Sequence, residues 1–261
     1  MTIIYQIPDC SNFEFYHWFY YALATLHEIK DISGIVFFTV PMQNLEFQIS
    51  SLKLLEHTFK CVNDINNLPD KDNIVYTKLH NIIAGHNNIP EQKEIYSFLR
   101  RNLLDKNIFT DIKQLSRLIY ISRGKTTTKV RHVLNESIII PLLKEIGFEI
   151  IYLEDYPLNE KIRIFMEAKV LISSTGGALS LGIFLNKDAH VIQLVNDTVF
   201  QWGMAFLPIF KELNLSVTQY TNLSTVDNDM NPVTTRCETA NIILDDITDF
   251  MNCVDKCLKN L

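Results

Sequence analysis

Between residues 117 and 195, short apolar segments alternate regularly with amphipathic ones, and this alternation leaves few folds open to the chain. Apolar runs rich in β-branched and aromatic residues predict strands, and they lie at 118–122, 148–153, 170–173 and 190–195. Three helical patterns lie between these runs. The first ends at Gly147, the second covers 158–168, and the third covers about 178–185. Strands and helices in this order predict an α/β fold with a parallel sheet that is covered on both faces.

The first part of the chain has the same character. It predicts strands at 2–7, 34–40 and 74–79, leaves a further short strand at 82–83 open, and predicts helices at 11–29, 47–58 and 91–104. Because the last of these helices connects the two halves, we place a boundary near residue 110. This divides the chain into a domain at 1–110 and a domain at 111–261.

Beyond residue 195 the pattern is less regular. We expect a helix at 202–213, a strand at 216–220, a polar loop at 221–237 and a final amphipathic helix at 241–261. A polar loop of this length is expected to be functional or mobile.

The composition excludes several classes of protein. With 47% hydrophobic residues, a chain of 261 residues can bury the core of one large or two modest domains. The net charge of −6 and the absence of Lys or Arg runs argue against a nucleic-acid partner. No apolar run approaches the roughly 20 residues that span a bilayer, and the first residues do not resemble a signal peptide. We therefore expect a cytoplasmic protein.

The cysteines indicate neither a disulfide framework nor a zinc site. They are odd in number and lack CxxC spacing, and they lie at Cys10, Cys61, Cys237, Cys253 and Cys257. Cys253 and Cys257 are four residues apart on a predicted helix, but the sequence shows no two further ligands for zinc. Free thiols in a reducing compartment are the expected state.

Polar and glycine residues follow two of the predicted strands directly. Residues 122–125 are Ser-Arg-Gly-Lys, and residues 173–177 are Ser-Ser-Thr-Gly-Gly ahead of a helix. In an open parallel sheet, ligands bind beyond the carboxyl ends of the strands. A guanidinium, an ammonium and a glycine-rich helix N-terminus at that edge would suit a phosphate or diphosphate.

These segments resemble glycosyltransferase family 61, whose members include xylosyltransferases and N-acetylglucosaminyltransferases. The resemblance is carried by Tyr120-Ile121-Ser122-Arg123, Arg131, Asn135-Glu136, Gly147-Phe148, the helix at 158–165, Gly176-Gly177-Ala178 and Ile183-Phe184. It implies a GT-B-like fold, in which two Rossmann-type α/β domains face a cleft and a C-terminal helix packs back on the N-terminal domain. It also implies a nucleotide-sugar donor and inverting transfer.

The resemblance and the positions after the strands select candidate residues for binding the nucleotide-sugar donor. They are Ser122, Arg123, Lys125, Arg131, Asn135, Glu136, Thr175, Gly176, Gly177 and Ser180. Other roles stay open for several of them. Arg123 could pair with Glu136 or Asp155 on the surface, Lys125 could be merely solvated, and Asn135 and Glu136 could hold the Arg123 loop. The two glycines could serve only a tight turn.

The predicted catalytic residues lie in the aromatic-rich helix at 11–29. His17 matches the histidine that opens a helix beside the cleft in the family, and Glu14 lies one turn earlier; either could act as general base. His17 could equally be a core histidine. The chain departs from the family at Tyr21, where many members have Asp, and at Gly176, where many have His.

No metal or other cofactor is expected. Asp227-Asn228-Asp229 superficially matches the DxD metal motif of other glycosyltransferases, but it lies in the polar loop far from the nucleotide-binding strands, which favours turn residues. Asp245 and Asp246 are expected to lie at a helix N-terminus.

The sequence thus predicts an inverting glycosyltransferase of polysaccharide biosynthesis. It would move xylose or N-acetylglucosamine from a UDP-sugar to a glycan hydroxyl. Two alternatives stay open: a catalytically degenerate member that binds nucleotide-sugars or acts as a scaffold, and some other phosphosugar or nucleotide enzyme. The sugar, the acceptor and the oligomeric state leave no signal in the sequence.

Overall fold

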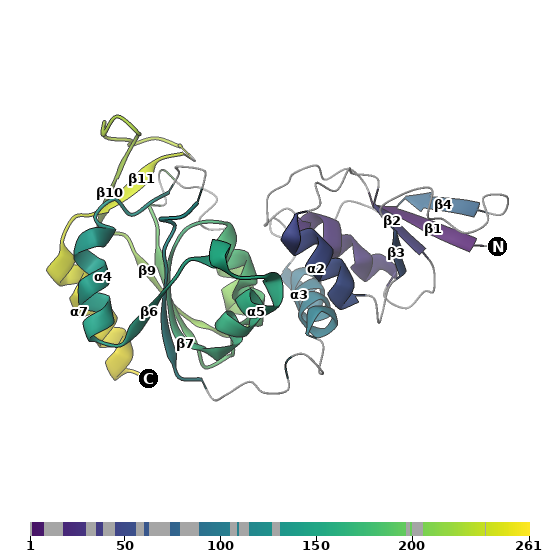
Figure 1. Cartoon of the computed structure of the whole chain (residues 1–261), viewed down its shortest axis with the longest axis horizontal. Coiled ribbons are helices and arrows are strands. Elements are labelled where there is room, and N and C mark those ends of the chain that lie inside the picture. Colours follow the sequence, from purple (N-terminus) through teal and green to yellow (C-terminus); the bar gives the residue numbers. More distant parts are fainter. Residues whose placement is uncertain are drawn as a thin grey trace. The chain divides into compact units, whose positions relative to one another are not determined.

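The computed structural model describes residues 2–7, 18–29, 35–38, 45–55, 60–62, 74–78, 89–104, 109, 115–126, 131–196, 199, 206–237 and 239–261. Contacts between Cα atoms divide the chain into two compact units. One unit comprises Met1–Thr110 with Pro157–Asn159, and the other comprises Asp111–Tyr156 with Glu160–Leu261 (Figure 1). That these units serve as acceptor-side and donor-side domains stays a prediction.

The second unit is built on a five-stranded parallel sheet, as the alternating pattern predicted. Its strands are β5 (Arg117–Ile121), β6 (Phe148–Ile151), β7 (Ala168–Ser174), β8 (His190–Leu194) and β9 (Ser216–Tyr220). They lie in the order β6-β5-β7-β8-β9, and every neighbouring pair is parallel. The three central strands β5, β7 and β8 bury successive side chains and therefore side chains on both faces of the sheet, because apolar residues there occupy successive positions rather than alternate ones.

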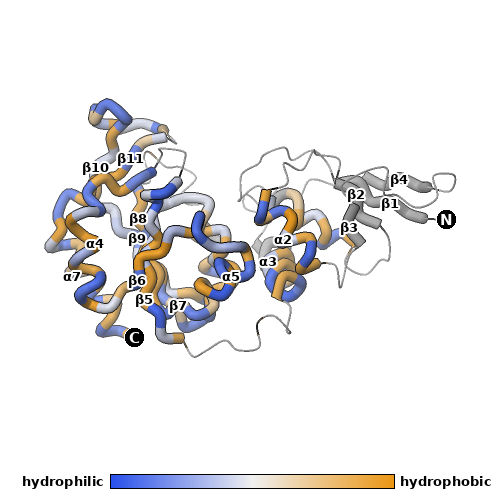
Figure 2. The backbone as a smooth tube through the Cα atoms, viewed as in Figure 1, coloured by the Kyte–Doolittle hydropathy of each residue, from blue (hydrophilic) through white to orange (hydrophobic). Residues whose placement is uncertain are grey.

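Helices cover both faces of this sheet (Figure 1). On one face lie α4 (Glu136–Glu145) and α7 (Ile247–Lys259), and on the other lies α5 (Leu158–Glu167). Figure 2 shows β5 and β6 as mainly hydrophobic segments between helices that carry both colours. The short helices of the unit are the 3-10 helices η5 (Leu153–Asp155) and η6 (Gly177–Phe184) and the α-helix α6 (Leu207–Glu212).

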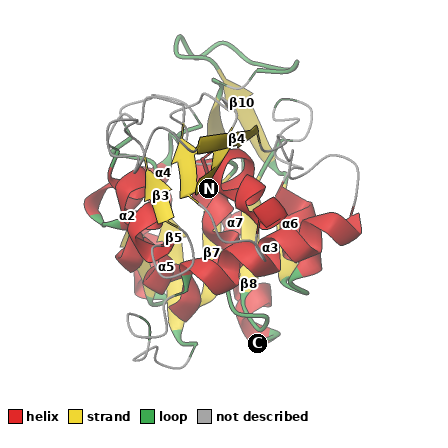
Figure 3. Ribbon diagram, turned by 90° about the vertical axis from the view of Figure 1, so that its right-hand side faces the viewer, coloured by secondary structure: helices red, strands yellow, loops and turns green. Residues whose placement is uncertain are grey.

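The C-terminal region differs from the prediction of a polar loop followed by one long helix. It contains β10 (Leu223–Val226), which Figure 3 labels, and β11 (Asn241–Leu244), and these two strands pair antiparallel (Figure 1). The helix α7 starts only after β11, where the Asp246 carboxylate accepts a hydrogen bond of 3.0 Å from the backbone N–H of Asp249. The prediction that the acidic pair at 245–246 marks a helix start is confirmed. Four-residue strands are too short for their apolar pattern to be distinguished from that of a helix.

Helix α7 packs on the sheet of its own unit. Phe250, Val254 and Cys257 are buried in the same core as Tyr120 of β5 and Ile192 of β8. The rings of Phe250 and Tyr220 lie edge to face with centroids 5.3 Å apart. Packing of this helix across the first domain, which the resemblance implied, stays a prediction.

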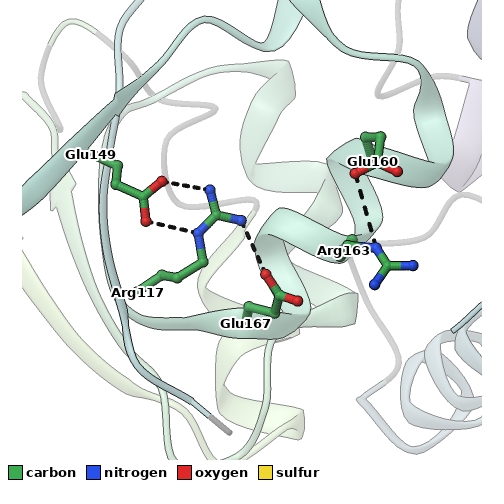
Figure 4. Close-up of polar contacts among 5 residues, drawn as sticks. All are labelled: Arg117, Glu149, Glu160, Arg163 and Glu167. Carbon is green, nitrogen blue, oxygen red and sulfur yellow. Dashed lines mark hydrogen bonds and ion pairs between the residues drawn. The ribbon is translucent and has the colours of Figure 1, made fainter. Parts of the chain in front are cut away.

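An ion-pair cluster holds together the end of the sheet where β5 begins. The Arg117 guanidinium donates to both carboxylate oxygens of Glu149 at 2.8 and 2.7 Å, and to Glu167 at 3.1 Å (Figure 4). The hydrogen bond from Arg117 lowers the pKa of Glu149 below its usual value, and the bond to Glu149 raises the pKa of Arg117. This cluster therefore links β5, β6 and the end of α5 at the edge opposite the carboxyl ends of the strands.

The first unit contains a four-stranded parallel sheet in the order β3-β2-β1-β4. Its strands are β1 (Thr2–Ile7), β2 (Ile35–Phe38), β3 (Lys60–Val62) and β4 (Ile74–Lys78). The three-residue strand β3 was not predicted, and the open possibility of a strand at 82–83 lies outside the described residues. The α-helices are α2 (Glu46–Leu55) and α3 (Ile89–Leu103).

The aromatic-rich segment of the first unit is a buried helix. Its described part consists of a π-helical turn (Trp18–Ala22) and a 3-10 helix (Leu23–Ile29). Trp18, Phe19 and Tyr20 are buried, and the indole of Trp18 donates a hydrogen bond of 2.8 Å to Ser51. Core packing therefore accounts for these three aromatic residues. Among the described residues, no helix has both the length and the apolar character needed to span a bilayer.

Candidate functional site

The two polar segments selected from the sequence lie at the same edge of the second unit's sheet. Strands β5 and β7 pair in parallel, with Ile121 opposite Ser173. Residues 122–123 and 174–176 therefore leave the sheet side by side, beyond the carboxyl ends of adjacent strands. This is the edge at which parallel α/β sheets bind ligands.

Arg123 and Gly176 are in direct contact at this edge. A Cβ atom built on Gly176 would lie only 2.6 Å from Nη1 of Arg123, so the guanidinium occupies the space beside the glycine. Burial and, next, the positive charge of Arg131 lower the pKa of Arg123 to about 10, while Glu154 acts in the opposite direction. The positive charges of Arg123 and Arg131 thus act on each other at this edge of the sheet.

Glu136, the first residue of α4, holds the loop that carries Arg123. Its carboxylate accepts hydrogen bonds from the hydroxyl of Tyr120 at 2.7 Å and from the hydroxyl of Ser122 at 2.8 Å. The Ser122 oxygen in turn accepts the backbone N–H of Gly124 at 3.0 Å. Burial, followed by the charge of Glu136, raises the pKa of Tyr120 well above its usual value. The structure therefore gives Glu136 the loop-holding role that the sequence left open.

Replacing Glu136 should destabilise the protein. In the Glu136→Ala variant the buried hydroxyls of Tyr120 and Ser122 lose their acceptor, and each buried polar group left unsatisfied costs about 1–3 kcal/mol. We expect urea unfolding to show a loss of at least about 2 kcal/mol. Glu145→Ala, on the exposed end of the same helix, is the matched control and should change stability by less than about 0.5 kcal/mol. Equal losses in both variants would show that the hydrogen bonds to Glu136 contribute nothing.

Lys125 lies at the exposed rim of the loop. Its ammonium forms an ion pair with Asp155 and lies 4.8 Å from the centre of the Tyr152 ring. The hydrogen bond to Asp155 raises the pKa of Lys125. These contacts with residues after β6 give Lys125 a structural partner at the rim, and its contact with a ligand stays a prediction.

Residues 131–135 are attached to β11. The backbone N–H of Arg131 donates to Ala240 at 3.0 Å, and the side chain of Asn135 bonds both the carbonyl and the N–H of Leu244, at 2.9 and 3.2 Å. Arg131 has a φ of 57°, a left-handed conformation that non-glycine residues rarely adopt. The side-chain amide of Asn135 thus has a structural role, and the backbone attachment holds Arg131 in its uncommon conformation.

The hydroxyl side chains around the end of β7 and the start of η6 are buried. The Thr175 hydroxyl donates to the Leu194 carbonyl at 3.2 Å and accepts from Gln193 at 3.1 Å, which ties it to β8. Gly177 begins η6, and Ser180 is buried within that helix. Ser174 belongs to the polar run 173–177 but was not among the donor-binding candidates, and it has a buried Oγ without a hydrogen bond to any described residue. Only its place in a run of small hydroxyl residues could have indicated it.

The predicted catalytic residues His17 and Glu14 lie outside the described residues. Tyr21, at the position of the family's Asp, belongs to the π-helical turn at the start of the buried helix. The identity of the general base therefore stays a prediction.

The acidic motif at 227–229 forms a turn. The Asp227 carboxylate accepts the backbone N–H groups of Asp229 and Asn231, each at 2.9 Å. A hydrogen bond from the Asn231 side chain, followed by these backbone hydrogen bonds, lowers the pKa of Asp227. The prediction of turn residues at this place is confirmed. Across the part of the chain that the structure describes, no group of three or more His, Cys, Asp or Glu residues could hold a metal ion, and Cys237, Cys253 and Cys257 are free thiols.

Comparison with known proteins bears on the family to which the chain belongs. The sequence pattern of the family Glycosyltransferase 61 matches residues 15–192, which is more than half of the chain and includes both Arg123 and Gly176. No curated protein matches the chain as a whole or in part. The resemblance seen in the sequence is confirmed: the chain belongs to glycosyltransferase family 61 and is a transferase that uses a sugar donor and an acceptor.

Proposed function

We propose that the protein is an inverting glycosyltransferase that transfers a sugar from a UDP-linked donor to a hydroxyl of a glycan. Xylose and N-acetylglucosamine are the first sugars to test. The observation that carries the proposal is the Arg123 guanidinium at the carboxyl edge of β5 and β7, beside Gly176 and near the charge of Arg131. In this proposal residues 111–261 bind the nucleotide-sugar and residues 1–110 provide the acceptor side.

The hydrogen bonds of the site decide which groups can stabilise a departing diphosphate. A hydroxyl has one hydrogen to donate, and Ser122 donates it to Glu136 while Thr175 donates it to Leu194. Neither hydroxyl can then donate to a phosphate oxygen without breaking that bond. Arg123 and Arg131, with the first backbone N–H groups of η6, are therefore the groups that we assign to the diphosphate.

The proposed reaction is a single displacement. A general base removes the proton of the acceptor hydroxyl, the acceptor oxygen bonds to the anomeric carbon from the face opposite the diphosphate, and the bond to the diphosphate breaks with its electron pair. Positive charge already fixed at the leaving group lowers the barrier without a reorganisation of solvent. We assign the base to His17 or Glu14, because both side chains can accept a proton near neutral pH.

Nucleotide binding measured by isothermal titration calorimetry tests the proposal. The panel comprises UDP, GDP, UDP-xylose and UDP-N-acetylglucosamine, and we expect the uridine compounds to bind with dissociation constants between about 1 μM and 1 mM. Chromatography of each incubated UDP-sugar would show whether free sugar is released, and the donor that releases its sugar would identify the sugar that is transferred. If none of the four compounds binds at about millimolar concentration, the proposed donor class is wrong.

A further inference from the structure

Three glycines of the second unit are required for three different reasons. Gly147 has a φ of +92°, so its backbone conformation favours glycine. The φ of Gly182 lies outside the range that favours glycine, but a Cβ there would lie 2.5 Å from the ring of Phe210, which is fully buried. Gly176 differs from both, because the space where its Cβ would lie is taken by the tip of a charged side chain.

The backbone of Gly176 does not need glycine. Its φ of 167° and ψ of 179° are those of extended backbone, which any residue adopts. A Cβ would nevertheless lie 2.6 Å from Nη1 and 3.6 Å from Cζ of Arg123, and the first distance is far shorter than an ordinary van der Waals contact of about 3.5–4.0 Å. Glycine at residue 176 thus leaves free the space that the Arg123 guanidinium occupies.

We infer that Gly176 is a positioning residue, which leaves the space at the start of η6 to the Arg123 guanidinium and so sets where that positive charge meets the ligand. The inference rests on the proposed function in so far as the ligand is a nucleoside diphosphate. Arg123 follows β5 and Gly176 follows β7, so adjacent strands hold both backbones. The guanidinium stands at the end of a flexible side chain. A substitution at residue 176 should therefore displace Arg123 and leave the fold intact.

A double-mutant cycle tests this coupling. The proteins are wild type, Gly176→Ala, Arg123→Ala and the double variant, and UDP is the ligand in calorimetry. We expect Gly176→Ala to weaken UDP binding by about tenfold, because displacing Arg123 removes a charged hydrogen bond. In the Arg123→Ala background the same substitution should have no further effect, since coupled residues are not additive. Independent losses that multiply in the double variant would overturn the inference.

Gly182→Ala is the matched control, because Gly182 lies in η6, the 3-10 helix that Gly176 precedes. Its added methyl group would collide with the buried Phe210 ring rather than with Arg123. We expect a lower melting temperature and an unchanged affinity for UDP. Gly176→Ala should show the reverse pattern, with an almost unchanged melting temperature and a lost affinity. Melting curves and titrations of the two variants on the same preparations separate a positioning role from a packing role.

A second measurement keeps the inference testable if UDP is not the ligand. Arg123 is half-buried in the wild type, and displacement from Gly176 should expose it to phenylglyoxal, which modifies arginine side chains. The rate of labelling of Arg123, read by peptide mass spectrometry without nucleotide, should rise in Gly176→Ala and stay unchanged in Gly182→Ala. An unchanged rate in Gly176→Ala would overturn the positioning role. Absence of UDP binding to the wild type, with the labelling rate raised, would instead count against the proposed donor alone.

Discussion

Arg123→Ala should weaken UDP binding by about tenfold to a hundredfold while leaving the melting temperature almost unchanged. A hydrogen bond to a charged group contributes roughly 1.5–3 kcal/mol, and the variant loses at least one such bond to the diphosphate. Arg123→Lys should restore little of this loss, since an ammonium cannot form two parallel N–H···O bonds with one phosphate. Isothermal titration with UDP measures the affinity, and a thermal melt measures stability.

Arg117→Ala provides a matched control, because Arg117 lies at the other end of β5. It binds Glu149 and Glu167 rather than the site at the carboxyl edge (Figure 4). We expect this variant to lose about 1 kcal/mol of stability and to keep the affinity for UDP. Arg117, the first residue of β5, and Arg123, which follows the strand, should thus show opposite patterns. If Arg123→Ala and Arg123→Lys both bind UDP as the wild type does, Arg123 does not belong to the site.

Phe250→Ala should lower the free energy of unfolding by about 3–5 kcal/mol, the range for a fully buried phenylalanine. Phe250 is buried in the core that α7 shares with the sheet, and its ring meets Tyr220 edge to face at 5.3 Å. Removing the ring leaves a cavity between helix and sheet, because neighbouring side chains relax only in part. Urea unfolding followed by circular dichroism gives the value.

The control for this prediction is Asp255→Ala, on the exposed face of the same helix. Asp255 is exposed and forms an ion pair with Lys259 one turn away, so we expect a change within about 0.5 kcal/mol. A loss of less than about 1 kcal/mol in Phe250→Ala would contradict the assignment of α7 to the core of its own unit.

The local pattern of the sequence determined the sheet and the position of the site. Hydrophobic periodicity is a local signal, because it depends on which side chains are buried within a window of a few residues. It predicted the five parallel strands close to their observed bounds, for example β9 (Ser216–Tyr220). Once these strands were known to be parallel, Arg123 and Gly176 had to leave the same edge of the sheet, because parallel strands end together. Family membership also followed from the sequence alone.

Only the tertiary structure decided which of the candidate side chains hold the site together. The sequence left open whether Glu136 contacts the ligand or holds the Arg123 loop, and the structure shows its hydrogen bond with Ser122. Thr175 was a donor-binding candidate, and its hydroxyl donates to Leu194. Asn135 bonds a strand 109 residues further along the chain. Such partners depend on how distant segments meet, and a contact over that separation leaves no periodic signal in either segment. The β10–β11 pair was missed for another reason, because four-residue strands leave too short a pattern. The fit of Gly176 against Arg123 exists only where β5 and β7 end side by side.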